Sequence, residues 1–408
     1  MATKKKSATK KPATKKKPVA QKKAAIKKVT NKSKTTKSAK SKSKPPTKKK
    51  AVVPKKKTKA PKKSAKTASK PKPKPKPRPK SSAKILPKKF LMDLAQAIKV
   101  AVLPEMASTK GRAIVGSAQS GDATFHIDAV AEKALKNFLT NAKQPVVYYS
   151  EDAGYTTFTN EQPTHLLLID PIDGTRAAKC GFEGCVISVC STRVIERPTF
   201  ADIDSGLIME LTEDRFFYAE RGHGARIHYN GHSKKAKISQ NEDVETMAWS
   251  MTVPARPAEL IFPTSAKLID ITSLKGGFFA CNSSSYSLTR LVTNQLDACV
   301  DIANRFYRDI PDAVEDAFIN AGRGTVLGVC PYDYAAALLI AQEAGCVVTD
   351  AYGKGFDDLL LLDSSPENHQ TIIAATNAKL HKKLLSYYDT RITQLAQLLQ
   401  ERYEATGA

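Results

Sequence analysis

The first 90 residues of this 408-residue chain contain no acidic side chain and almost no large apolar one. They hold 37 Lys and Arg residues, whereas the rest of the chain holds 29 basic and all 39 acidic residues, a net charge of −10. The formal charge of +27 therefore describes neither part. The composition indicates a polycationic tail joined to a mildly acidic body.

Cysteine pairs and long apolar runs are also missing. All seven cysteines lie in the body, and the five-residue spacing of Cys180, Cys185 and Cys190 does not match a zinc site. The N-terminus lacks the apolar core of a secretion signal, and no run approaches the roughly 18 apolar residues of a membrane span. We therefore expect reduced thiols, no membrane span and a cytoplasmic protein, with the nucleoid or nucleus as alternatives because of the basic tail.

Residues 1–88 are built from Lys, Ala, Thr, Ser and Pro. Residues 71–80 alternate Pro with Lys or Arg, which favours polyproline II. So little apolar surface cannot offset chain entropy, and we predict a disordered tail over 1–88. Its composition resembles the lysine-rich tails of histone H1 and of bacterial histone-like proteins. Such a tail would bind nucleic acid or another polyanion by counterion release, and a solvated spacer is the alternative.

The body of about 320 residues is long enough for a large core. Apolar residues recur at helical spacing over 90–106, whereas 145–149, 166–169, 185–190 and 371–375 read as strands. Residues 303–329 are not assigned. Strands followed by helices predict an α+β layered fold, with an N-terminal half at 89–280 and a C-terminal half at 281–408.

One stretch, residues 166–175, organises the body. Four apolar residues lead into Asp170, Pro171 interrupts the strand ladder, and Asp173 precedes Gly174 and Thr175. Two carboxylates at the end of a buried strand are costly unless a cation compensates them. The same residues also suit an Asx-type turn, and the stretch alone leaves both interpretations open.

Other acids occur in the same context, at a strand end or helix start. They are Asp128, Glu151 and Asp333. Carboxylate oxygens suit Mg²⁺, and two such ions about 4 Å apart assist phosphoryl transfer. Asp128 also suits a helix N-cap, which is its alternative role.

These motifs resemble the signature of the inositol monophosphatase family of Mg²⁺-dependent, lithium-sensitive phosphatases, whose superfamily includes fructose-1,6-bisphosphatase. The resemblance rests on Asp-Pro-Ile-Asp-Gly-Thr at 170–175, Ser-Glu-Asp at 150–152 and Asp-Tyr-Ala-Ala-Ala at 333–337, and it spans roughly residues 90–390. It implies an αβαβα sandwich and a phosphatase of a sugar, inositol or nucleotide phosphate, acting as a homodimer.

The resemblance also implies two or three Mg²⁺ ions and their ligands. Glu151, Asp170 and the Ile172 carbonyl would hold the first ion, and Asp170, Asp173 and Asp333 the second. A third, weaker ion would lie near Glu151, which is thus implied in both metal binding and catalysis.

Further roles follow from the same resemblance. Thr175, backed by Asp128, would orient the attacking water, and the amides of Gly174 and Thr175 would bind the phosphate. The residues at the positions that contact the released alcohol are Ser283, Ser284 and Asp301.

The chain departs from the family pattern in two places near the expected site. Arg176–Lys179 differs from the usual sequence after Thr175, and about 25 extra residues at 303–329 separate Asp301 from Asp333. The insertion could cap the site and supply a cation, or be a surface loop or a subunit contact. Inositol phosphate, fructose 1,6-bisphosphate and 3′-phosphoadenosine 5′-phosphate all remain open as substrates. The alternative to an enzyme is a histone-like nucleic-acid-binding protein whose phosphatase body is a scaffold.

Overall fold

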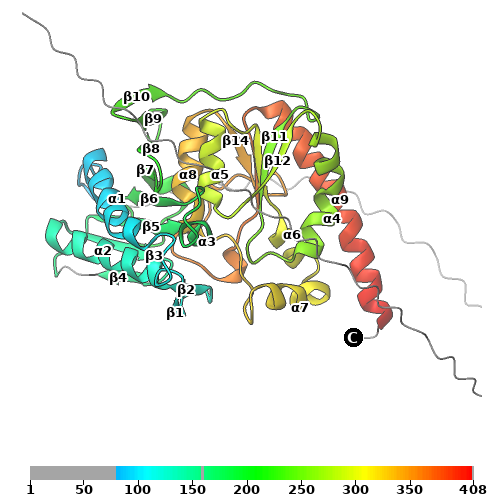
Figure 1. The fold of residues 1–408 in the computed structure, drawn as a ribbon, viewed down its shortest axis with the longest axis horizontal. Coiled ribbons are helices and arrows are strands. Elements are labelled where there is room, and N and C mark those ends of the chain that lie inside the picture. Colours follow the sequence, from blue (N-terminus) through cyan, green and yellow to red (C-terminus); the bar gives the residue numbers. More distant parts are fainter. Residues whose placement is uncertain (1–79, 158–159, 407–408) are drawn as a thin grey trace, which may run out of the picture. The chain divides into compact units, whose positions relative to one another are not determined.

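The computed structural model describes residues 80–157 and 160–406, which form two sheets with helices between and around them (Figure 1). The predicted disorder and polyanion binding of the tail fall almost entirely outside these residues. Within them, no helix is long and apolar enough to cross a membrane.

The larger sheet has eight strands in the order β10-β9-β8-β7-β6-β5-β3-β4. Only β3 and β5 pair in parallel, whereas the other neighbours are antiparallel. The strands are β3 (Val146–Ser150), β4 (Gly154–Thr157), β5 (His165–Asp173), β6 (Val186–Thr192), β7 (Ile203–Glu210), β8 (Arg215–Glu220), β9 (Ala225–Tyr229) and β10 (His232–Lys235).

The smaller sheet has five strands in the order β12-β11-β13-β15-β14. Its parallel strands β11, β12 and β13 end at one edge. The strands are β11 (Ala248–Thr252), β12 (Gly277–Cys281), β13 (Ala298–Asp301), β14 (Val347–Thr349) and β15 (Ile372–Ala375), and β1 (Ile114–Ser117) and β2 (Ala123–Phe125) form a separate hairpin.

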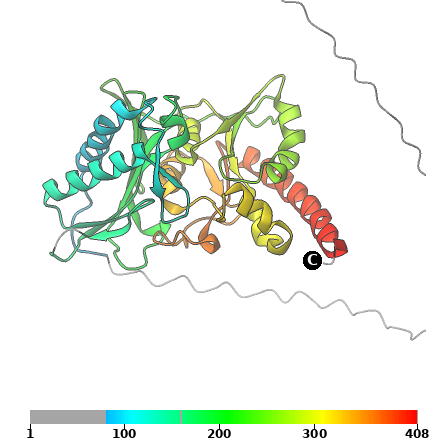
Figure 2. The same cartoon turned by 60° about the horizontal axis from the view of Figure 1, so that its bottom comes forward.

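The helices form three layers that alternate with the two sheets, with α1 and α2 on one outer side and α9 on the other (Figures 1 and 2). Helices α5 and α8 contact both sheets, and α4, α6 and α9 cover the far face of the smaller sheet. The helices are α1 (Lys88–Val102), α2 (His126–Ala142), α3 (Thr175–Ala178), α4 (Ala258–Thr272), α5 (Ser284–Val292), α6 (Ala303–Asp309), α7 (Pro311–Ala321), α8 (Pro331–Glu343) and α9 (Ala378–Thr406), with short 3₁₀ turns at Leu103–Glu105, Phe200–Asp202 and Pro366–Asn368. The predicted layered α+β sandwich is confirmed.

The central layer explains two apolar stretches of the sequence. Helix α8 is buried at every position from Tyr334 to Ala341 because it lies between the sheets. Strand β5 is buried throughout because helices cover both faces of its sheet. As predicted, Pro171 interrupts the strand ladder, because the pairing of β5 with β6 has a register irregularity between Asp170 and Asp173, although the strand itself runs on to Asp173.

Several elements were not read from the sequence. The unassigned residues 303–329 contain α6 and α7, and the stretch before residue 281 contains β11, α4 and β12. The second sheet thus begins at Ala248, and the predicted division of the body at residue 280 stays a prediction.

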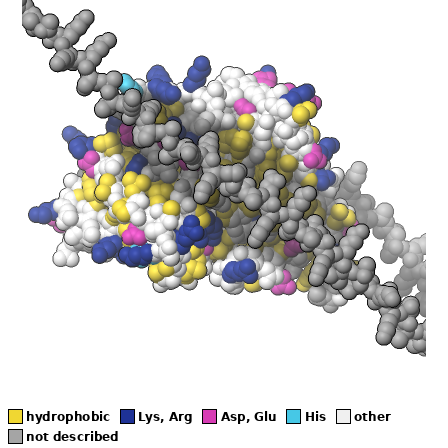
Figure 3. Space-filling view, in the orientation of Figure 1, with side chains coloured by type: hydrophobic (Ala, Val, Ile, Leu, Met, Phe, Trp, Pro, Cys, Tyr) yellow, Lys and Arg dark blue, Asp and Glu magenta, His cyan; other side chains and the backbone are white. Residues whose placement is uncertain are grey.

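The surface of the described residues carries charges of both signs. Figure 3 shows basic and acidic side chains interspersed on one face, with apolar side chains gathered over the side of α1 and α2. Among the exposed apolar residues of that region are Val100 and Leu103.

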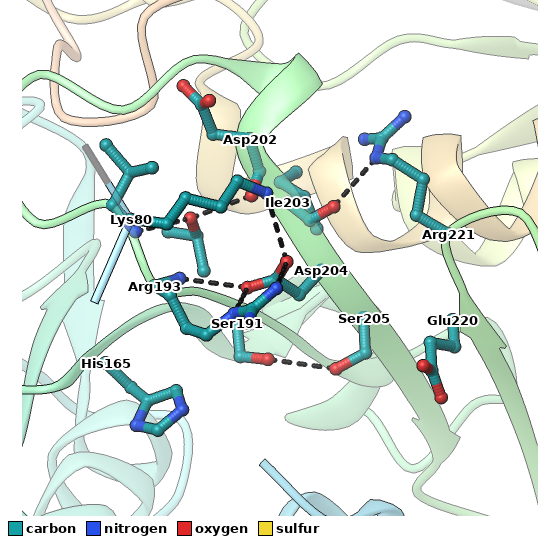
Figure 4. Close-up of polar contacts among 12 residues, drawn as sticks. Lys80, His165, Ser191, Arg193, Asp202, Ile203, Asp204, Ser205, Glu220 and Arg221 are labelled. Atoms are coloured by element: carbon teal, nitrogen blue, oxygen red, sulfur yellow. Dashed lines mark hydrogen bonds and ion pairs between the residues drawn. The ribbon is translucent and has the colours of Figure 1, made fainter. Parts of the chain in front are cut away.

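The start of the described chain is fixed to the larger sheet through Asp204 of β7 (Figure 4). The Asp204 carboxylate accepts hydrogen bonds from Lys80 Nζ at 3.2 Å and from the Arg193 guanidinium at 2.9 Å. Ser81 N donates to the Arg193 carbonyl at 2.9 Å, and Leu86 is buried. The last residues of the predicted tail, 80–87, therefore pack on the body.

Candidate active site

The end of β5 supplies two buried carboxylates in a tight local geometry. Asp170 is 2% exposed, and its Oδ1 accepts a hydrogen bond from Ile172 N at 2.9 Å. This contact is the Asx-type turn that the sequence left open. The turn uses one carboxylate oxygen and orients the other lone pairs away from the backbone, so the turn does not exclude a ligand role.

Three acids from different elements meet at this point. One carboxylate oxygen each of Glu151, Asp170 and Asp333 lies within 4.8 Å of the others. Glu151 follows β3, Asp170 lies in β5 and Asp333 occupies the first turn of α8. The sequence thus correctly predicted that these three residues come together.

Burial and mutual repulsion raise the pKa of each of these acids well above its ordinary value. Burial is the largest cause at all three, and the charge with the largest effect is that of Asp333 on Glu151, Glu151 on Asp170 and Asp173 on Asp333. Cys330 N donates to Asp333 Oδ2 at 2.7 Å, which fixes that side chain. The cluster is therefore costly as it stands and would be stabilised by a cation.

Asp173 is held by the start of α5. Its Oδ2 accepts hydrogen bonds from Ser283 Oγ at 2.6 Å and Ser285 N at 2.7 Å. Burial raises its pKa to about 7, although these bonds oppose the shift. Ser283, predicted to contact the alcohol, is fully buried and serves here as the N-cap of α5, whereas Ser284 lines the pocket.

Thr175 and Asp128 form a polar pair beside the cluster. Thr175 Oγ1 lies 3.0 Å from both Asp128 Oδ1 and the Ile172 carbonyl, two acceptors for one hydroxyl hydrogen. Burial raises the pKa of Asp128 to about 7. Asp128 is not the N-cap of α2; it lies three residues inside the boundary, where its Oδ2 accepts from Phe125 N at 2.8 Å.

The pocket over these acids contains two arginines that were not predicted as site residues. Arg176 pairs with Asp122 at 2.9 Å, and Arg256, whose side chain is 8% exposed, pairs with Asp301 at 2.7 Å. Asp301 is 1% exposed and is not among the described residues that line the pocket, so the arginine and not the acid faces the expected alcohol position. Arg256 follows β11 at the carboxyl edge of the parallel strands, where ligands commonly bind, and this placement could have identified it.

The 303–329 insertion contributes to this pocket through Leu327 and Gly328. Two of its three arginines are engaged elsewhere: Arg305 binds Asp389, and Arg308 donates to the His369 carbonyl. Arg256, in the loop after β11, is a cation that lines the pocket, and a cation supplied by the insertion stays a prediction.

The donor set fits a hard divalent cation. All candidate ligands are oxygens, three of them converge, and the described residues place no basic nitrogen within salt-bridge distance of Glu151, Asp170 or Asp333. The seven cysteines are all free thiols and contribute no ligand to the described cluster.

Two proteins of similar sequence are named as phosphatases. The chain is 24% identical over 310 residues to the "Bifunctional NADP phosphatase/NAD kinase" of Methanococcus maripaludis, covering 74% of this chain and 49%, about half, of that longer protein. It is 24% identical to the "Fructose-1,6-bisphosphatase/inositol-1-monophosphatase" of Methanothermobacter thermautotrophicus, covering 72% of this chain and 92% of the relative.

Solved structures match in fold. A Pyrococcus horikoshii protein described as similar to inositol-1 monophosphatase has a TM-score of 0.54 at 21% identity, covering 74% of this chain and 97% of its own. The Thermotoga maritima IMPase has a TM-score of 0.53 at 18% identity, covering 75% and 98%. Residues 88–392 match the sequence profile of the inositol monophosphatase family. The chain therefore belongs to this family and is a phosphoric monoester hydrolase.

Proposed function

We propose that this protein hydrolyses a small phosphate monoester in a Mg²⁺-dependent reaction. The observation that carries the proposal is the convergence of Glu151, Asp170 and Asp333, one buried and two half-buried carboxylates whose oxygens lie within 4.8 Å of one another. The Ile172 carbonyl and Asp173 complete the expected ligand set for two or three ions. Bound Mg²⁺ would polarise the phosphoryl group and favour ionisation of an attacking water.

The chain's own residues would position the reactants. The Gly174 and Thr175 amides lie at the start of α3 and would bind phosphate oxygens. The Thr175 hydroxyl, held between Asp128 and the Ile172 carbonyl, would fix the attacking water. With a pKa of about 7, Asp128 is suited to take up a proton through Thr175 near neutral pH.

The pocket charges favour a substrate with a second anionic group. Arg256 neutralises Asp301, which in the family pattern would accept hydrogen bonds from a neutral alcohol, and Arg256 itself lines the pocket. Ser284 offers a hydroxyl from the adjoining helix start. We therefore favour a bisphosphate or a phosphorylated nucleotide over inositol monophosphate.

Phosphate release tests both parts of this proposal. The full chain should require Mg²⁺, and Asp170→Asn should lower kcat/KM at least about a hundredfold, or about 2.7 kcal/mol. Full activity in that variant, with its fold intact, would remove the assignment. Inositol phosphate, fructose 1,6-bisphosphate, 3′-phosphoadenosine 5′-phosphate and NADP form the panel, and a clear preference for the inositol ester would contradict the substrate class.

We also propose that the tail binds nucleic acid or a similar polyanion, because 37 basic residues and no acid lie within residues 1–90. Removal of residues 1–73, which leaves the compact unit Lys74–Ala408, should abolish most binding in a gel shift at low salt. Unchanged binding would contradict the role. Free thiols support a reducing, cytoplasm-like compartment, and family likeness supports a homodimer.

A further inference from the structure

Helices α4 and α9 enclose a groove whose charged lining is entirely basic. Lys267 comes from α4, and Lys382, Lys383 and Arg391 come from α9; the other four lining residues carry hydroxyl or amide groups. We call this surface the α4–α9 groove. It lies far along the chain from the acidic cluster and shares no lining residue with the active-site pocket.

The two walls of the groove are joined by specific contacts. The Tyr387 hydroxyl donates to the Thr264 carbonyl at 3.0 Å and accepts from Leu268 N at 3.1 Å. The two helices lie side by side in the structure (Figure 1). The groove therefore has fixed walls and is not a chance alignment of mobile elements.

The positive charge of the groove is only partly offset: the Asp270 carboxylate of α4 contributes, after burial, to the raised pKa of Tyr387. Lys383 Nζ donates to the Glu242 carbonyl, and Arg391 donates to the Gln394 side chain and the Pro263 carbonyl, all neutral acceptors. Within residues 80–157 and 160–406, none of the four cations forms a salt bridge. A local excess of positive charge on a net acidic body marks an anion-binding surface.

The donors of the groove follow a line. Lys382, Ser386 and Thr390 succeed one another at i+4 along one face of α9, a span of about 12 Å at 1.5 Å per residue. A row of cations and hydroxyls suits the repeating anionic oxygens of a phosphodiester chain. A membrane surface is less suited, because the lining offers no aliphatic side chain to insert.

We propose that the α4–α9 groove binds the phosphate backbone of a nucleic acid. It would act as a second contact on the body beside the tail, whose binding would raise the local concentration of nucleic acid at the groove. The inference extends the polyanion binding proposed above and is independent of phosphatase chemistry.

Matched variants of the full chain test the groove. Lys267→Gln/Lys382→Gln/Lys383→Gln removes three charges from it, whereas Lys234→Gln/Lys235→Gln/Lys237→Gln removes three equally exposed charges near β10. Binding of a duplex DNA is measured over a salt series. The groove variant should lower the slope of log K against log salt by about 2 to 3, since each lost phosphate contact contributes about 0.9. Equal effects of the two variants would overturn the proposal, and both should retain phosphatase activity.

Lysine acetylation footprinting tests the same groove in the unaltered full chain, without any substitution. In the unaltered full chain, duplex DNA should protect Lys267 and Lys382 severalfold, while Lys234 and Lys235 remain reactive. Protection by anionic vesicles but not by DNA would replace nucleic acid with a membrane surface and so overturn the proposal. If the unaltered protein showed no phosphatase activity while DNA still protected these lysines, only the proposed phosphatase function would be contradicted.

Discussion

At the scale of single residues, Asp170 combines two roles that the sequence presented as alternatives. Its Oδ1 closes a local turn with Ile172 N, and the same carboxylate takes part in the three-acid cluster. The turn fixes the side chain before any cation binds. A carboxylate held in this way loses less conformational freedom on ligation, which favours tight metal binding.

Two substitutions at Thr175 distinguish a positioning role of its hydroxyl from a packing role of its side chain. Thr175→Ser keeps the hydroxyl oxygen near Asp128 and Ile172 and should retain activity within about tenfold. Thr175→Val keeps the shape of the side chain but removes the hydroxyl. It should lose activity about a hundredfold or more, because positioned proton-transfer groups contribute about 10²–10⁴ to the rate. Steady-state phosphate release at saturating Mg²⁺ measures both. Equal activity of the two variants would exclude a role for the hydroxyl.

Removing either charge of the Arg256–Asp301 pair should lower the free energy of unfolding. Arg256→Met leaves Asp301 buried at 1% exposure without its partner, and about 3–5 kcal/mol of stability is the usual loss for such a change. Arg256→Met/Asp301→Asn should recover part of that loss, since no unpaired charge remains. Urea unfolding of the unaltered protein, of Arg256→Met, of Asp301→Asn and of the double variant measures this, and additive losses would show that the two side chains do not interact.

At the scale of elements, β5 and α3 meet at Gly174, whose φ of +93° suits glycine. A Cβ there would lie 2.6 Å from the Gly184 carbonyl oxygen. Gly174→Ala should therefore displace the phosphate-binding amides and lower both stability and activity. Gly222→Ala is the control, because its φ is also positive, +81°, yet nothing lies within 4 Å of the added Cβ. Differential scanning fluorimetry measures the stability of the two variants, and phosphate release measures their activity. Gly174→Ala should lose more of both than Gly222→Ala, and equal losses would show that the clash does not occur.

An element could be predicted from the sequence where its apolar pattern differed clearly from that of the neighbouring residues. The apolar stretch 166–169 was predicted as a strand and lies in β5, and Asp333 was predicted at an element boundary and lies in the first turn of α8. Helix α4 carries Pro263 inside it, and β12 has no fully buried residue, so neither shows the usual apolar periodicity. Arg256 was missed with these elements.

The site could be predicted only as far as local motifs extend. Glu151, Asp170 and Asp333 were expected together because each stands at a strand end or helix start and because their motifs resemble the family signature. Ser283 was expected at the substrate, but its hydroxyl supports Asp173, a contact between residues 110 positions apart that depends on how the two sheets pack. Long-range pairs of this kind leave no spacing pattern in the chain.

At the scale of the whole molecule, the acidic cluster links stability to pH and to Mg²⁺. Folding raises the pKa of Asp128 and Asp173 from an ordinary 3.8 to about 7, and the pKa of Asp170 rises as well. The folded state therefore binds more protons than the unfolded chain between these values, and stability without metal should fall as pH rises from about 4 to about 7.

Mg²⁺ should reverse this trend, because a bound cation compensates the ionised carboxylates, whereas at lower pH protons compete with it. Melting temperature is measured with Mg²⁺ and with Na⁺ at equal ionic strength. The gain from Mg²⁺ should be larger near pH 8 than near pH 5.5, where the raised pKa values keep part of the cluster protonated. Asp170→Asn should melt higher than the unaltered protein without metal at pH 8 and gain less from Mg²⁺. A gain from Mg²⁺ that is independent of pH and survives this substitution would place the ion outside the cluster.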